Sequence, residues 1–479
     1  MYTKNLITFI SVLIGSLLFS TAASCQNRSA FVLEGKIVGL KHEKLVFNRV
    51  QGHREFKVKE LNVGSDGAFT IRLDEAPPQG QYRLRIDPAG RNAILDFLLS
   101  GEDIRFTTYA ASLTDSIRFE KSKTNQAWYN YFRIKEAYEA RLSILEQLLD
   151  LYPKDERFYP EIIKEFSLLQ DELDAEIEEL IGPFPNTLLA RYIQSDRPVR
   201  INPAASAQER QEFVQYNYLN HVDFTDTMLL HTDIFPGKAL SYIMLYRNSR
   251  FDREKQTREF IRATDNLLPL AMSQPTVYNY LLSYTISGFE QIGLEQVLTF
   301  IAANYPIDES CLSDQDSGEL QRRMEGYRQL APGKVAPAIL ADDINGKSFQ
   351  LGEAGSEKTL IVFWASWCPH CTVMLPEIRN LAIQKNSDLI AGQNPVLHVV
   401  SVSIDHSEDD YLRYLEKNGL HEDQVGNFWV NICDYQAWEG KVADDYYLYA
   451  TPTMILLDRD LTIIGKPSTM NELNTLLRK

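Results

Sequence analysis

The chain has 479 residues, 44% of them hydrophobic and 24% charged, so its composition is globular and its length exceeds a single ordinary core. A formal net charge of −16 at pH 7 argues against a protein that mainly grips phosphate backbones, so no nucleic acid is expected among its partners. Only five cysteines occur, which excludes a small disulfide scaffold and directs attention to the one close pair.

Residues 1–24 have the pattern of a signal peptide, because Lys4 precedes a mostly apolar stretch from Leu6 to Phe19 and small residues follow it. The stretch is too short to cross a membrane, and the sequence contains no other apolar run that is long enough. The segment from Ala22 to Cys25 resembles the lipobox of bacterial lipoproteins, although leucine is usual at its first position. This resemblance implies that Cys25 carries a lipid anchor to a membrane of the cell envelope, in the periplasm; the alternative is plain secretion.

From Phe31 to about Thr108 apolar and polar residues alternate, and turn residues interrupt the alternation. The pattern predicts strands at 31–38, 69–73 and 82–86, among others. Several short strands at this spacing are typical of a β-sandwich, which we expect over residues 25–110. No catalytic constellation is visible within this segment.

Between about residues 112 and 330 the hydrophobic period changes to that of helices, which predicts an α-helical domain over residues 111–330. One apolar stripe marks a long helix and comprises Trp128, Tyr131, Tyr138, Leu142, Leu145, Leu149 and Tyr152. Further helices are predicted at 158–181, 207–217, 236–248 and 316–329. We interpret the stripe as core packing. His221 and His231 lack partners at metal-ligand spacing, so we expect them to be structural or surface residues.

The last predicted domain spans residues 331–479. It begins with a β-hairpin between 337 and 351, after which strands and helices alternate. The predicted strands are 359–364, 396–404, 428–432, 453–457 and 461–464, and the predicted helices begin near 368, 408, 437 and 470. This order predicts an α/β fold that ends in a β-hairpin and a helix.

The sequence from Phe363 to Cys371 places a Cys-x-x-Cys pair directly after a predicted buried strand and at the start of a helix. Unpaired backbone N–H groups and the positive end of the helix dipole stabilise a thiolate there, which predicts Cys368 as the exposed nucleophile. Cys371 lies on the first helical turn and is predicted to be the partly buried resolving thiol. The two thiols can close a disulfide and release a mixed-disulfide partner.

Two features accompany the pair: Pro376 lies within the following helix, and Thr451-Pro452 directly precedes a predicted strand. Together with the segment Trp364 to Cys371 and a helix-strand insertion before Tyr446, they resemble the TlpA/ResA-like thiol-disulfide oxidoreductases of the bacterial envelope, which belong to the thioredoxin superfamily. The resemblance implies a thioredoxin-like fold for residues 331–479, protein or small-molecule disulfide and thiol substrates, and a redox partner that recycles the pair. It also implies a cis peptide bond before Pro452. The residues expected to shape the substrate site are Trp367, Pro369, His370, Thr451 and Pro452.

The sequence departs from that family at two positions. Val362 stands where thioredoxin has a buried aspartate, and Met374 stands where TlpA/ResA-like proteins often have glutamate. A buried carboxylate is commonly assigned the proton transfer from the resolving thiol, so its absence puts the rate of that step in doubt. Glu377 is predicted to face solvent rather than replace it.

The direction of exchange stays open on sequence grounds. The dipeptide Pro369-His370 also occurs in the oxidant DsbA and argues for an oxidising couple, whereas the resemblance argues for a reductase. We favour reduction because Thr451 matches the reductase family. The alternatives are a disulfide oxidase or isomerase, and a binding lipoprotein whose thioredoxin-like domain is incidental.

An alternative enzyme class, a metal site and the two remaining thiols are judged from the residues around them. A peroxiredoxin is disfavoured because Ile361 and Ala365 stand where its signature requires proline and threonine. His370 could join the two thiolates on a metal ion, but three ligands within four residues would distort the helix start, so neither a metal nor a cofactor is expected. Cys311 and Cys433 are predicted to be lone thiols.

Overall fold

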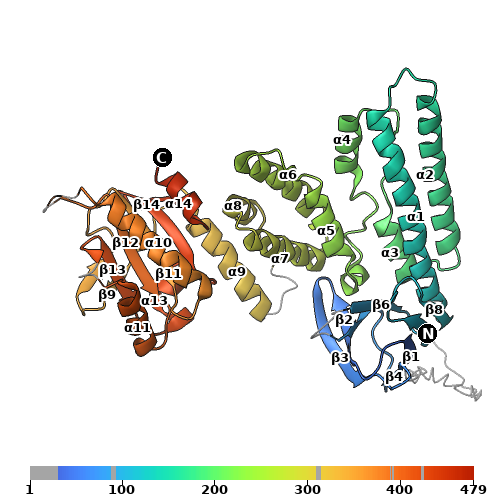
Figure 1. Cartoon of the computed structure of the whole chain (residues 1–479), viewed down its shortest axis with the longest axis horizontal. Coiled ribbons are helices and arrows are strands. Elements are labelled where there is room, and N and C mark those ends of the chain that lie inside the picture. Colours follow the sequence, from blue (N-terminus) through green and yellow to red (C-terminus); the bar gives the residue numbers. More distant parts are fainter. Residues whose placement is uncertain are drawn as a thin grey trace, which may run out of the picture.

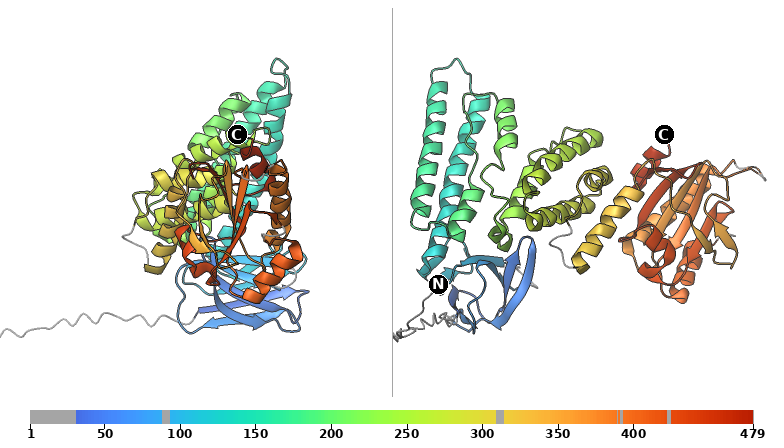
Figure 2. Two further views of the ribbon diagram at one scale, coloured as in Figure 1. Left: turned by 90° about the vertical axis from the view of Figure 1, so that its left-hand side faces the viewer. Right: turned by 180° about the vertical axis from the view of Figure 1, so that it is seen from behind.

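The computed structural model describes residues 31–87, 93–308, 314–388, 390, 393–421 and 425–478. The predicted signal peptide, Cys25 and Cys311 lie outside these residues. Three regions follow one another along the chain (Figure 1). They are a β-sheet region (residues 31–121), a helical region (residues 123–329) and a third region (residues 331–478), which we call thioredoxin-like after the resemblance above. The β-sheet and thioredoxin-like regions lie toward opposite ends of an elongated molecule, with helices between them (Figure 2).

The β-sheet region contains two four-stranded sheets with the strand orders β4-β1-β7-β8 and β3-β2-β5-β6. Alternate side chains of both sheets point into one shared hydrophobic core, which is why the sequence alternates with period two. The strands are β1 (Phe31–Val38), β2 (Lys44–Gln51), β3 (Arg54–Asn62), β4 (Ala68–Leu73), β5 (Gly80–Ile86), β6 (Ala93–Leu99), β7 (Ile104–Tyr109) and β8 (Arg118–Lys121).

Strand β8 lies beyond residue 110, where the sequence pattern placed the end of this region. It pairs antiparallel with β7, with Phe119 opposite Phe106. The ring of Phe119 packs against the rings of Phe106 and Phe97, at centroid distances of 6.1 and 6.4 Å. This aromatic contact ties the strand to the sheet although a loop separates it from β7.

The helical region begins with a long helical pair. Helix α1 (Lys123–Leu151) packs against α2 (Tyr159–Ile181), and the predicted stripe is confirmed as core packing because Trp128, Tyr131 and Tyr138 are buried. The remaining elements are α3 (Leu188–Asp196), α4 (Ala207–Asn217), η1 (Thr227–His231), α5 (Ile234–Met244), α6 (Arg253–Ala271), α7 (Pro275–Gln291), α8 (Glu295–Asn304) and α9 (Asp314–Gln329). None of the helices within the described residues is long and apolar enough to cross a membrane.

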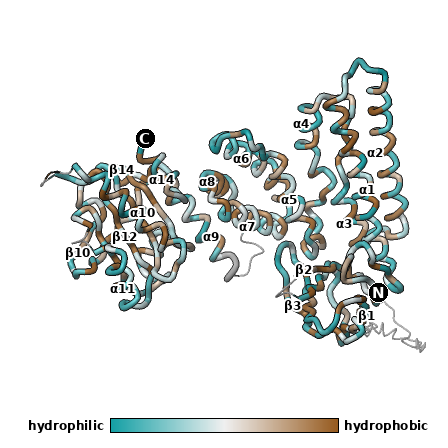
Figure 3. The backbone as a smooth tube through the Cα atoms, viewed as in Figure 1, coloured by the Kyte–Doolittle hydropathy of each residue, from teal (hydrophilic) through white to brown (hydrophobic). Residues whose placement is uncertain are grey.

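The thioredoxin-like region is built on a five-stranded sheet with the order β13-β12-β11-β14-β15. Strands β11, β12 and β13 run parallel, and β14 runs antiparallel to β11. Apolar residues run along the central strands, as expected for a sheet buried on both faces (Figure 3). The strands are β9 (Leu340–Asp342), β10 (Ser348–Gln350), β11 (Lys358–Trp364), β12 (Leu397–Ser403), β13 (Trp429–Cys433), β14 (Thr453–Asp458) and β15 (Ile463–Gly465).

The helices of this region are α10 (Pro369–Lys385), α11 (Glu408–Asn418), η3 (Ala437–Glu439), α13 (Lys441–Asp445) and α14 (Met470–Leu476). The alternation of strands and helices predicted from the sequence is confirmed, including the opening hairpin of β9 with β10. The carboxyl ends of β11, β12 and β13 lie at one edge of the sheet. The loops that leave this edge carry most of the candidate site.

Candidate functional site

The cysteine pair lies where a buried strand passes into a helix. Strand β11 ends at Trp364, and α10 begins at Pro369, so Cys368 is the N-cap residue of that helix. Its Sγ accepts a hydrogen bond from the backbone N–H of Cys371 at 3.2 Å. One of the N–H groups that a helix leaves unpaired at its start is therefore aimed at the sulfur, which favours a thiolate when the pair is reduced.

Cys368 and Cys371 form a disulfide with their Cα atoms 5.3 Å apart, a separation typical of disulfides. The structure corrects one expectation, because Cys368 is not exposed in this state. Cys368 is 4% exposed and Cys371 is 0% exposed. The sulfur of Cys368 is turned toward the first turn of α10 and toward the carbonyl of Thr451, rather than toward solvent.

The loop that precedes β14 faces the pair from the other side. The peptide bond between Thr451 and Pro452 is cis, as the resemblance implied. The carbonyl oxygen of Thr451 lies 3.5 Å from Sγ of Cys368. The structure thus brings Thr451 and Cys368 together although 83 residues separate them in the sequence.

The other predicted residues lie around the pair at the surface. Trp367 is 52% exposed, and both Pro369 and His370 are exposed on the first turn of α10. Among the described residues there is no cluster of three or more side chains suited to a metal ion. Glu377 is exposed as predicted, Met374 is half-buried, and Val362 is fully buried.

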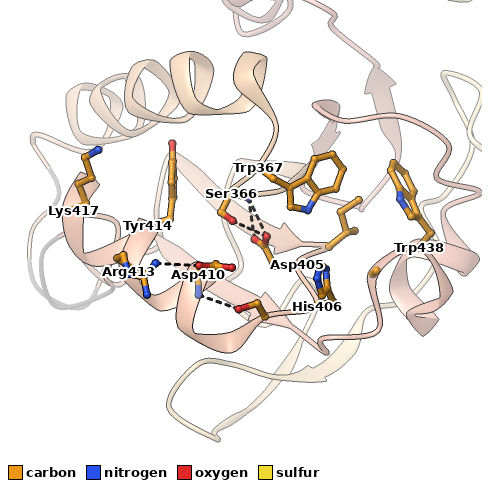
Figure 4. Close-up of a pocket in the computed structure, with 12 residues that line it drawn as sticks. Ser366, Trp367, Asp405, His406, Asp410, Arg413, Tyr414, Lys417 and Trp438 are labelled. Atoms are coloured by element: carbon orange, nitrogen blue, oxygen red, sulfur yellow. Dashed lines mark hydrogen bonds and ion pairs between the residues drawn. The ribbon is translucent and has the colours of Figure 1, made fainter.

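Sequence reasoning missed Asp405, a buried carboxylate that follows β12. Its oxygens accept hydrogen bonds from the backbone N–H of Ser366 at 2.9 Å and from the hydroxyl of Ser366 at 2.7 Å (Figure 4). The hydroxyl of Ser403 donates a further hydrogen bond to this carboxylate at 2.7 Å. This carboxylate holds the turn two residues ahead of Cys368. A polar residue at the carboxyl end of the strand beside β11 is the signal that could have revealed it.

A groove of about 720 Å³ opens beside this turn (Figure 4). Trp367 and Trp438 stand at one end, with ring centroids 6.4 Å apart, and Arg413 and Lys417 of α11 line the other. Trp438 belongs to η3, which the structure separates from α13 within the single helix predicted to begin near residue 437. At its tryptophan end the groove offers an apolar surface next to Cys368.

Cys433 is a free thiol at the end of β13, as predicted, and its Sγ lies 3.5 Å from the carbonyl oxygen of Asp405. Burial raises the pKa of the Cys433 thiol to about 11. At neutral pH this sulfur is protonated and a poor nucleophile, in contrast to a thiol at a helix start.

A disulfide at a helix N-terminus, opposite a cis-proline loop on a five-stranded sheet, defines a thiol-disulfide exchange protein of the thioredoxin fold. Residues 355–463 match the thioredoxin-like family. A thioredoxin-like protein of Haemophilus influenzae is 30% identical over 146 residues, which cover 29% of this chain and 74% of the relative. The chain belongs to the thioredoxin-like family and is a TlpA/ResA-like thiol-disulfide oxidoreductase.

Two further proteins are similar to parts of this chain. The thiol-disulfide oxidoreductase ResA of Bacillus subtilis is 22% identical over 139 residues, which cover 29% of this chain and 68% of the relative. A crystal structure of a thioredoxin-like protein from Bacteroides caccae is 21% identical, has a TM-score of 0.40, and is matched over 59% of this chain and 96% of its own.

The carboxylate of Asp405 gives a test of how the turn is held. In Asp405→Asn, the Ser366 amide should exchange its hydrogen about 10- to 100-fold faster, because hydrogen bonds to a charged group contribute ~1.5–3 kcal/mol. Hydrogen–deuterium exchange mass spectrometry of the peptide that contains Ser366 measures this. Asp388→Asn, at an exposed position after α10, is the matched control and should leave the rate unchanged. Unaltered protection in Asp405→Asn would contradict the assigned role.

Proposed function

We propose that Cys368 and Cys371 are the redox-active pair with which this oxidoreductase exchanges disulfides with protein substrates. The observation that carries the proposal is the position of Cys368 at the N-cap of α10, disulfide-bonded to Cys371 and facing the carbonyl of Thr451. A thiolate at this position is stabilised by the helix start, and a second thiol lies within bonding reach.

In the reducing direction the reaction has two displacement steps. The Cys368 thiolate attacks one sulfur of the substrate disulfide, and the other substrate sulfur leaves as a thiolate that takes up a proton. Cys371 then loses its proton and attacks Cys368, which releases the second substrate thiol and closes the Cys368–Cys371 disulfide. Two electrons pass to the substrate, so a dithiol redox partner must reduce the pair before the next cycle.

Surface residues around the pair are proposed to shape the substrate site. Trp367, Pro369 and His370 flank Cys368 on one side, and the Thr451-Pro452 loop flanks it on the other. No carboxylate stands at the positions of Val362 and Met374, so the proton of Cys371 passes to the departing thiolate or to water. The resolving step is therefore the one that this site supports least.

Cysteine replacements test the assignment. Cys368→Ser should abolish turnover of a protein disulfide, because the attacking thiolate is removed. Cys371→Ser should instead accumulate a mixed disulfide at Cys368, because the resolving thiol is removed. Non-reducing electrophoresis and mass spectrometry distinguish the two outcomes. Cys433→Ser is the control and should keep full activity; retained turnover in Cys368→Ser would refute the proposal.

We further propose that the favoured direction is reduction, with disulfide oxidation or isomerisation as the alternative. The support is the match of Thr451 to the reductase family. The opposing feature is the Pro369-His370 dipeptide, since stabilising the thiolate stabilises the reduced form and makes the couple more oxidising.

The reduction potential decides between these directions. Equilibration in glutathione buffers, read by alkylation and mass spectrometry, should give a value near or below the ≈ −270 mV of thioredoxin. A value nearer the ≈ −120 mV of DsbA would assign the chain to the oxidases or isomerases.

The proposed location is the bacterial cell envelope, with the chain held at a membrane by lipid on Cys25. The support is the signal-peptide pattern and the lipobox-like sequence, together with relatives named thiol-disulfide oxidoreductase ResA. Protein thiols and disulfides are the proposed substrates, and a redox partner in the same compartment recycles the pair. The net charge of −16 argues against binding to the phosphate backbone of nucleic acids.

Lipid attachment has a direct test. Cys25→Ser should move the chain from the membrane fraction to the soluble fraction and remove acyl mass from the mature N-terminus. The substitution removes the attachment site, and stable anchoring needs two or more buried acyl chains. Fractionation of the native host with N-terminal mass spectrometry measures both. A wild-type mature chain that carries no acyl group would leave plain secretion as the answer.

A further inference from the structure

Residues 444–450 lead into the Thr451–Pro452 bond, and helix α9 of the helical region holds them along one side. The guanidinium of Arg322 donates a hydrogen bond to the carbonyl of Leu448 at 3.2 Å. It also pairs with the carboxylate of Asp444 at 3.1 Å. The backbone just ahead of the cis-proline loop is therefore bonded to a region outside the thioredoxin-like fold.

A chain of hydroxyl groups makes a second connection, closer to the site. The hydroxyl of Tyr327 donates to the carboxylate of Glu290 in α7 at 2.6 Å. Tyr449, two residues ahead of Thr451, has its hydroxyl oxygen 2.6 Å from that of Tyr327. Because the one hydrogen of Tyr327 is directed to Glu290, Tyr449 must donate to Tyr327. Arg323 pairs with Glu290 and fixes the far end of this chain.

Close packing of the same helix on Tyr447 supports the connection. A Cβ atom added at Gly326 would lie 2.7 Å from the Cβ of Tyr447, so only glycine permits this approach. Gly318 on the same helix has open space at the corresponding position. The glycine at 326 is thus required by the contact and not by the helix, in which glycine is less favourable than alanine by ~1 kcal/mol.

The rear of the loop faces a small cavity between the two regions. Its volume is about 190 Å³, and its lining includes Tyr327, Tyr449, Pro452 and Thr453. Lys466 closes one side through an ion pair with Glu295 of α8 at 2.5 Å. The cavity leaves the loop room to shift toward the helices when its anchors are removed.

We propose that the helical region positions the loop 449–452 against the redox pair, through the Tyr449–Tyr327–Glu290 chain and the contact at Gly326. The inference rests on the proposed function of Cys368 and Cys371. Tyr327 and Tyr449 are positioning residues, because the group that faces the sulfur is the carbonyl of Thr451. The loop covers one side of Cys368, so we expect a polypeptide disulfide to contact it, whereas a small disulfide needs only the sulfur.

Two glycine variants of the full chain provide a matched test. The assay is the reduction of insulin by dithiothreitol that the protein catalyses. In this assay Gly326→Ala should raise the KM for insulin by about 5- to 10-fold and leave kcat within twofold. The apparent affinity falls in proportion to the fraction of molecules whose loop is in the binding-competent position. The reaction of the reduced protein with 5,5′-dithiobis(2-nitrobenzoic acid) should stay within twofold. Gly318→Ala should behave as wild type in both assays.

Tyr449→Phe removes one hydroxyl and should raise the insulin KM in the same way, with circular dichroism confirming the fold. Tyr242→Phe is its control, because Tyr242 makes a similar 2.9 Å hydroxyl pair with Tyr246 within the helical region. If Gly326→Ala does not fold, Tyr449→Phe decides. An unchanged KM in the folded variants overturns the proposal, as does an equal loss with the small disulfide. A wild-type chain inert toward both disulfides would instead refute the proposed function.

Discussion

Strand β11 is buried from Thr359 onward and is hydrogen-bonded on both sides, to β12 and to β14. The pairing therefore fixes the position of its carboxyl end. The chain must turn there within a few residues to begin α10. Cys368 is the residue at which helical hydrogen bonding starts, so its sulfur meets an N–H group that no carbonyl occupies. The chemistry of the site follows from this placement, because the same cysteine in mid-helix would meet only paired backbone groups.

Two loops from neighbouring strands complete that arrangement. Asp405, after β12, accepts hydrogen bonds from the backbone N–H and the hydroxyl of Ser366 in the turn and one from the hydroxyl of Ser403. The Thr451 carbonyl, before β14, faces the sulfur of Cys368. The buried carboxylate is thus committed to the turn. Val362 is apolar and Glu377 points to solvent, so neither residue places a carboxylate beside the resolving thiol.

The helical region makes specific polar contacts with both of the neighbouring regions. On the β-sheet side, Gln81 and Arg83 of β5 bond to Asp233 at 2.9 and 3.3 Å, and the backbone N–H of Gly52 donates to the carbonyl of Leu230 at 2.9 Å. On the other side, α9 is bonded to the segment that leads into Thr451. These contacts give the helices a structural path to the redox site, which weakens the interpretation of the thioredoxin-like region as incidental.

The sequence by itself determined many of the strands and helices and the cysteine pair, because hydrophobic period, helix starts and the spacing of Cys368 from Cys371 are local properties. The long helix α1 and the solvent-facing Glu377 were predicted in the same way, whereas strand β8 was not predicted. Asp405, Trp438 and the Tyr327–Tyr449 bond were not, since each acquires its role from a partner far along the chain: Asp405 is 39 residues from Ser366, and Tyr449 is 122 residues from Tyr327. The burial of Cys368 was predicted wrongly for the same reason. Tertiary structure decided these features, because a polar side chain has no preferred partner until the fold brings one within hydrogen-bond distance.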